Sequence, residues 1–556
     1  MDYPLAVIPS HNGFQSSPKK LTVTTPRCIT GILYLALLLH RTGGLPSSSS
    51  SASAASSSST LLPPPSLQDM SIAEPSALLD AGAVTSPELT ALYLQRIAEA
   101  NGVLHAIIEV GAPAALTPAA QRERERDAGR IADNYATAVT GYGHHYYREG
   151  DDDDTAMPAG GATAASGSAC LEGLRRRSAG AGAEAAVVAR LRDVGAVVLG
   201  KTNQEEFSGR WRCASSGSAV AASLGLAAGT LGMETAGGIA CPAWTNNVCR
   251  HQADGGPDLA AQHRVRDGAT EHGGPARAGR RGRGPAPRRR LGRDARDNWT
   301  LAQPWDRDDA EPRRRNMAAL NASALAGRRL GMFWTDEDAF GAAYFEIWGL
   351  AGQIFEAAPA DLVPPGRSAR ELVGRLNDNM AVYAMPDGRD AMQAYLRGFL
   401  AEEPGSGSGV RSFCDLLRCV ETDPRERAAD FGCAYLAMMA SSNVSAGGPE
   451  VWAAYAAASA LGRGAVAEYG LDALVVFPGV AVVLASAPGL PIVTVPMGAL
   501  GAGAGAGAAT RWAEEALVGY AYAYEQALRK RSSLKPYVQP VSDLDPILPR
   551  PQPAAN

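Results

Sequence analysis

The sequence of 556 residues is poor in lysine and in aromatic residues. Aromatic residues make up 6% of the chain, and the formal net charge is -5. Neither a basic surface nor a set of stacking rings therefore indicates that the chain binds nucleic acid or a membrane. Only five lysines occur in the whole chain: Lys19, Lys20, Lys201, Lys530 and Lys535.

The eight cysteines lack the Cys-x-x-Cys or Cys/His spacing that is typical of zinc sites. Their scattered positions suit a reducing compartment and slightly favour the cytoplasm. Cys414 and Cys419 lie five residues apart on an expected helix and are interpreted as packing residues. The acidic run Asp151–Asp154 lacks the alternating ligand spacing of a calcium or magnesium site and is interpreted as a solvated loop. No metal site is expected.

Residues 1–70 differ in composition from the rest and are interpreted as a disordered leader. The apolar run at 28–39 is too short to span a bilayer as a helix. Secretion stays open if this run is part of a signal segment. The sequons at Asn298, Asn321 and Asn443 are compatible with secretion.

A globular α/β domain is expected over residues 71–545, followed by a tail at 546–556. Thr85-Ser86-Pro87-Glu88 combines a capping hydroxyl with a proline in the first turn and predicts a helix start. Residues 500–510 form a Gly-Ala repeat and are expected to be a flexible loop. Further helices are expected at 184–194 and 511–531, and buried strands at 196–199, 473–477 and 491–495.

Three blocks of sequence, in this order, resemble the amidase signature family. The blocks are Gly200–Asn203, Ala214–Ser218 and Glu234–Ala243. A small-residue helix is expected between the second and third blocks, from Ala219 to Thr230. Weaker landmarks extend the resemblance over roughly residues 72–545. The resemblance implies one large domain in which helices cover a mixed, twisted β-sheet on both sides.

The resemblance also implies hydrolysis of the C–N bond of a small-molecule carboxamide, without a cofactor. In the family a serine attacks the carbonyl, and a second serine on a cis peptide relays its proton to a neutral lysine. Backbone N–H groups of a Gly-rich turn stabilise the oxyanion. That turn corresponds here to Thr235, Ala236, Gly237 and Gly238.

The reactive side chains of this mechanism are missing from the matching positions. Gly238 stands at the nucleophile position and has no hydroxyl. The relay position falls on Ala214, or on Ser215 or Ser216 if one residue was lost from the loop. The catalytic lysine is expected near 148–152, where the sequence has no lysine. Lys201 belongs to a strand-end motif and is not the base in the family.

Residues 250–290 turn abruptly to arginine, glycine, proline and alanine. The family has a buried strand with an Ile-Lys-Pro-Thr-like sequence here, which the codons of His251–Asp254 can encode when they are read one base later. We therefore hypothesise a reading-frame error between about Cys249 and Leu291. The alternative, a basic nucleic-acid patch, lacks aromatic residues that could stack on bases.

Three interpretations remain from the sequence. The first is an amidase-type hydrolase with degraded catalytic segments, which is inactive in this form. The second is a catalytically dead member that binds a ligand or a partner through the remaining pocket. The third is a decaying product that folds poorly because a central strand has been lost. The sequence carries no information on which amide is bound or on the oligomeric state.

Overall fold

The computed structural model describes the globular part of the chain with gaps. The expected leader at 1–70 lies outside the described residues except for 66–68 and 70. The expected helix at 184–194, the segment 148–154 and the tail also lie outside them. The described residues are 66–68, 70, 73–127, 138–141, 170, 196–203, 215–234, 237–246, 248, 250–252, 265–268, 318–332, 361–363, 369–402, 410–476, 478–495, 505–509, 514–528 and 538–544.

The helix α2 (Ser86–Leu104) starts as the sequence predicts. The Thr85 side chain accepts a hydrogen bond from the Glu88 N–H, and the Glu88 carboxylate accepts one from the Thr85 N–H at 2.8 Å. This capping box satisfies N–H groups that the first helical turn leaves without partners. The helix runs two residues beyond Gly102 and ends at His105, which has a left-handed backbone. The helices α1 (Ala73–Asp80) and α3 (Ala112–Asp127) flank it in sequence.

The strands form two hydrogen-bonded sheets, and both contain parallel and antiparallel pairs. The α/β class and the mixed strand directions are therefore as expected, and the described strands fall into two hydrogen-bonded sheets. The first sheet has the order β1 (Ile107–Val110), β3 (Val197–Thr202), β2 (Ala138–Gly141), β4 (Gly229–Met233) and β6 (Val265–Gly268). The second has the order β5 (Arg250–Gln252), β10 (Ile492–Val495), β11 (Gly505–Ala509), β9 (Ala473–Val476), β7 (Arg329–Met332) and β8 (Asp361–Val363).

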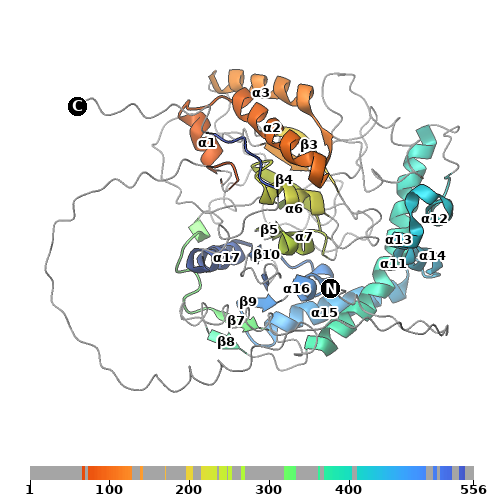
Figure 1. Ribbon diagram of the computed structural model, residues 1–556. Helices are drawn as coiled ribbons and strands as arrows, with labels where there is room; N and C mark the ends of the chain where they lie inside the picture. Colours follow the sequence, from red (N-terminus) through yellow and green to blue (C-terminus); the bar gives the residue numbers. More distant parts are fainter. Residues whose placement is uncertain are drawn as a thin grey trace, which may run out of the picture. The chain divides into compact units, whose positions relative to one another are not determined.

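The expected loop at 500–510 is wrong, because its second half is the strand β11. Gly507 pairs with Val493 of β10 on one side and with Val475 of β9 on the other, both antiparallel. Main-chain hydrogen bonds do not depend on side chains, so a Gly-Ala segment between two apolar strands completes the ladder despite its low strand propensity. The helices α16 (Pro478–Ser486) and α17 (Glu514–Leu528) pack near this part of the sheet (Figure 1).

The expected helix at 219–230 is also only half right. Helix α6 covers Ser216–Ser223, and the chain then turns at Gly225 into β4. Gly225 has φ of +60°, and a Cβ there would lie 2.3 Å from the Leu67 carbonyl oxygen. A left-handed backbone in such close contact with a neighbouring segment accepts only glycine, so this residue ends the helix.

The C-terminal half of the domain is mostly helical. The expected helix at 511–531 is observed as α17, whose Tyr520 and Tyr524 are buried. None of the described helices is long and apolar enough to cross a membrane. The remaining elements are α7 (Ala240–Thr245), α11 (Ala369–Glu402), α12 (Phe413–Thr422), the 3₁₀ turn η5 (Pro424–Glu426), α13 (Ala428–Phe431), α14 (Ala434–Ser441) and α15 (Pro449–Ala467).

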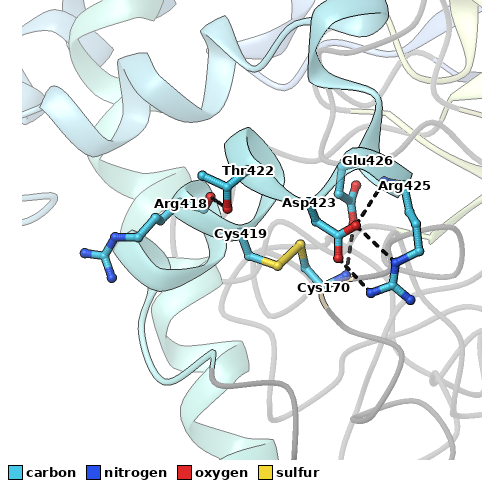
Figure 2. The surroundings of a disulfide bond; sticks show 7 residues. All are labelled: Cys170, Arg418, Cys419, Thr422, Asp423, Arg425 and Glu426. Atoms are coloured by element: carbon cyan, nitrogen blue, oxygen red, sulfur yellow. Dashed lines mark hydrogen bonds and ion pairs between the residues drawn. A yellow bond between two sulfur atoms is a disulfide. The ribbon is translucent and has the colours of Figure 1, made fainter.

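A disulfide bond joins Cys170 to Cys419 of α12, across 249 residues of sequence (Figure 2). The interpretation of Cys419 as a packing residue is therefore wrong, and Cys414 is an exposed free thiol. Cys170 is buried in a cluster of apolar side chains from α11, α12 and α14. This pair could not be predicted from the sequence, because cysteine partners far apart in the chain have no local signature.

Candidate active site

The second and third blocks of the sequence meet in space. Ser215 is fully buried at the start of α6, and its N–H donates a hydrogen bond to the Gly238 carbonyl oxygen at 2.9 Å. Helix α7, which follows Gly238, lies between α6 and α16 (Figure 1). Of the two candidate relay serines, Ser215 therefore contacts the expected nucleophile position directly, while Ser216 is half-buried as the first residue of α6.

Two residues of the Ser-rich block fix α6 against the first sheet. The Ser218 hydroxyl donates to the Leu231 carbonyl oxygen of β4 at 2.6 Å and lies 2.7 Å from the Thr202 hydroxyl of β3. A Cβ on Gly217 would lie 2.3 Å from the Ala106 carbonyl oxygen, so only glycine allows this approach. The block thus holds Ser215 in a defined position.

The carboxylate of Glu234 binds the turn that carries the nucleophile position. Its Oε1 accepts hydrogen bonds from the N–H groups of Gly237 and Gly238, and its Oε2 accepts from those of Ile239 and Ala240, both at 2.8 Å. Glu234 itself is 6% exposed. Four N–H groups that converge on one buried carboxylate give the turn a fixed shape, and this carboxylate is the acceptor of all four.

Gly237 is the residue that lets the chain turn here. Its φ is +117°, in a region that side chains rarely adopt. A Cβ at this position would lie 3.9 Å from a methyl group of Val482, on α16, and from the Cys241 Cβ. The turn therefore faces α16 with no side chain of its own at Gly237 or Gly238.

The role of Glu234 was not predicted from the sequence, although this residue lies within the third block. A carboxylate that stands three to six residues before a run of small residues can reach the N–H groups of that run, and this spacing was the available signal. Of the four residues assigned to the oxyanion turn, Gly237 and Gly238 are described, whereas Thr235 and Ala236 lie outside the described residues. Ala214 also lies outside them.

Lys201 is the only lysine among the described residues, and its ammonium is paired. Its Nζ lies 2.7 Å from the Glu109 carboxylate, on the neighbouring strand β1. The Lys201 side chain is 6% exposed and that of Glu109 is 39% exposed. Lys201 therefore takes part in an ion pair between β3 and β1.

The start of the anomalous segment occupies a strand position beside the site. His251 of β5 pairs with Val493 of β10, antiparallel. The family resemblance places a strand at this point of the sequence, and the main chain of Arg250–Gln252 forms one. Residues 253–264 and 269–290 lie outside the described residues.

Comparison with known proteins finds amidases that match this chain over most of its length. No family model matches the chain. A curated amidase relative from Arthroderma benhamiae is 26% identical over 516 residues, which are 82% of this chain and 81% of the relative. The solved peptide amidase from Stenotrophomonas maltophilia is 26% identical, with a TM-score of 0.63, over 83% of this chain and 98% of that one.

A bacterial aryl acylamidase of the amidase signature enzymes has a TM-score of 0.61 over 82% of this chain and 96% of that one, at 15% identity, and supports the fold alone. The order of the three blocks, the contact between Ser215 and Gly238, and the length of these matches lead to one family. These findings support the assignment of the chain to the amidase signature family, and its similarity to amidases extends over most of its length.

Proposed function

We propose that this chain descends from a hydrolase of small-molecule carboxamides and that, with glycine at position 238, it does not turn over amides. The observation that carries the proposal is the hydrogen bond from the Ser215 N–H to the Gly238 carbonyl oxygen. It holds the relay segment against a turn that Glu234 orders and that carries no hydroxyl at position 238.

In an intact version of this site, a serine at 238 would attack the amide carbonyl carbon. Its proton would pass through a hydroxyl at 214–216 to a neutral lysine and then to the departing nitrogen as the C–N bond breaks. Water would next attack the acyl ester and release the carboxylic acid and the serine. Removing the nucleophile of a serine hydrolase costs several orders of magnitude in kcat, and the residual rate comes from oxyanion stabilisation and binding.

The experiment compares ammonia release by the chain with that by Gly238→Ser and Gly238→Ala. Short peptide carboxamides are suitable first substrates, because the relative from Stenotrophomonas maltophilia is a peptide amidase. We expect no turnover by the chain or by the alanine control. Turnover by the chain at the rate of Gly238→Ser, with a chelator present, would contradict the assignment of position 238.

Sequencing the transcript across codons 140–295 tests the origin of the missing groups. A lysine codon near 148–152 and an Ile-Lys-Pro-Thr strand in the corrected frame would indicate an active parent enzyme. In that case the corrected chain still needs a serine at 238, because a frame error does not change one residue inside a matching block.

The second candidate function is ligand binding by a catalytically dead member. The absence of a hydroxyl at Gly238, within a turn whose four N–H groups remain ordered by Glu234, favours it. A binder would be stabilised by a peptide carboxamide, with a rise in Tm that grows with ligand concentration. No change in Tm at millimolar carboxamide would count against this candidate.

A further inference from the structure

The cysteine pairing of the described residues is that of a protein which folds under oxidising conditions. Cys170 and Cys419 form a disulfide, with their Cα atoms 5.9 Å apart, and Cys241 is also disulfide-bonded. Disulfides form and persist in secreted proteins and in the compartments through which they pass, whereas cytosolic thiols are kept reduced.

Burial and a hydrogen bond surround the Cys170 end of the Cys170–Cys419 disulfide. Cys170 is 2% exposed, and its N–H donates a hydrogen bond to the buried Glu426 carboxylate at 3.0 Å (Figure 2). Asp423, beside this contact, binds Arg425 at 2.7 Å. Cys170 is buried and Cys419 is half-buried, so access of thiolates to the bond is restricted on the Cys170 side, which favours a structural disulfide.

A second, independent feature concerns the asparagines. Asn321 and Asn443 each begin an Asn-x-Ser sequence without proline at the middle position, as N-linked glycosylation requires. They are also the only exposed residues among the described asparagines. The other described asparagines are half-buried and stand outside such sequences: Asn101, Asn203, Asn246, Asn377 and Asn379. A bulky hydrated glycan can be carried only where the folded chain leaves the side chain in solvent.

Both positions lie in turns between elements. Asn321 lies in the turn before β7, where its Oδ1 accepts a hydrogen bond from the Ser323 N–H at 2.9 Å. Asn443 lies between α14 and α15, and the Arg389 guanidinium donates to the carbonyl oxygens of Ser442 and Val444 on either side of it. The loop is thus anchored by its main chain, while the Asn443 side chain stays exposed.

We propose that this chain passes through a disulfide-forming compartment of a eukaryotic cell and carries N-linked glycans on Asn321 and Asn443. The side-chain amide nitrogen loses a proton and bonds to C1 of an oligosaccharide, as the bond from C1 to a lipid diphosphate donor breaks. The cysteine pair loses two electrons and two protons to the disulfide of an oxidoreductase. The proposal does not depend on whether the chain hydrolyses amides.

The test expresses the unaltered full chain in eukaryotic cells and treats the recovered protein with a peptide N-glycosidase. We expect increased electrophoretic mobility and conversion of Asn321 and Asn443 to aspartate in peptide mass spectra. Asn321→Gln and Asn443→Gln should each remove one mobility step. Ser323→Thr should keep the Asn321 glycan and Ser323→Ala should lose it, while the matched control Asn379→Gln should change nothing.

The thiols are measured on the same material. We expect Cys170 and Cys419 to resist alkylation until a reductant is added, and Cys414 to react at once. Full alkylation of both without reduction would overturn the proposal. Unchanged mobility after glycosidase treatment would overturn it equally, as would glycan on Asn298 alone.

Discussion

The contact between Glu234 and the turn at 237–240 allows a quantitative prediction. Glu234→Gln keeps the size of the side chain but replaces one acceptor oxygen by an NH₂ group. Two of the four N–H groups then face a donor instead of an acceptor. Because Glu234 is buried, water cannot easily replace the lost partner.

The expected cost follows from the hydrogen bonds. A hydrogen bond to a charged group contributes about 1.5–3 kcal/mol, and each buried donor left without a partner costs about 1–3 kcal/mol. The desolvation cost of the buried carboxylate offsets part of this. We therefore expect Glu234→Gln to lower the free energy of unfolding by about 2–4 kcal/mol, and Glu234→Ala to lower it by a similar amount.

Urea denaturation measures this change as a shift of the midpoint at constant m-value. The control is Glu371→Gln, an exposed glutamate in the first turn of α11, which should lose less than about 1 kcal/mol through the helix dipole alone. If the Glu234→Gln midpoint equals that of the control, the carboxylate does not hold the turn, and the shape of the turn at 237–240 has another origin.

Three further predictions concern the N-terminal helices and α12. The buried Tyr93 hydroxyl has no hydrogen-bond partner among the described residues. Tyr93→Phe should therefore leave the free energy of unfolding unchanged or raise it by up to about 1 kcal/mol, and a clear loss of stability in urea would contradict this. The buried Arg96 donates hydrogen bonds to three carbonyl oxygens, including that of Leu224 at 2.7 Å. Arg96→Ala should therefore lower the free energy of unfolding by about 3–5 kcal/mol, and a decrease below about 1 kcal/mol would contradict this. The hydrogen bond from the Ser412 hydroxyl lowers the pKa of Asp415, so its contribution to stability is complete above about pH 4 and falls as the pH drops through the lower folded-state pKa. Asp415→Asn should reduce this acid dependence in denaturation curves recorded from neutral pH to below about pH 4.

The structure agrees with the sequence where the signals are local. The capping residues Thr85 and Glu88 predicted the start of α2, because caps act within one helical turn. The apolar runs of β9 and β10 predicted buried strands, because that signal lies within the strand residues themselves. The strand β11 could not be predicted, since its place depends on the two strands beside it and not on its own glycines and alanines. The Cys170–Cys419 pair is likewise a product of the tertiary fold.

In the candidate site, too, some features could be predicted from the sequence and others could not. The resemblance assigns Ser215 and Gly238 to one site, and their main chains are in contact. The role of Glu234 was missed, because its partners are main-chain N–H groups and the only sequence signal is its spacing from a run of small residues. Only the geometry reveals which carboxylate receives them.

The contacts that shape the turn explain how it can persist without a nucleophile. Gly238 takes part through its main chain alone, with its carbonyl oxygen bound by the Ser215 N–H and its own N–H bound to Glu234. A hydroxyl at position 238 contributes to none of these contacts, so its loss removes chemistry while the fold keeps its hydrogen bonds. It follows that Gly238→Ser should unfold at nearly the same urea concentration as the parent chain, whereas Glu234→Gln should not. A large loss of stability in Gly238→Ser would mean that the turn has already relaxed into a shape that no longer accepts a side chain.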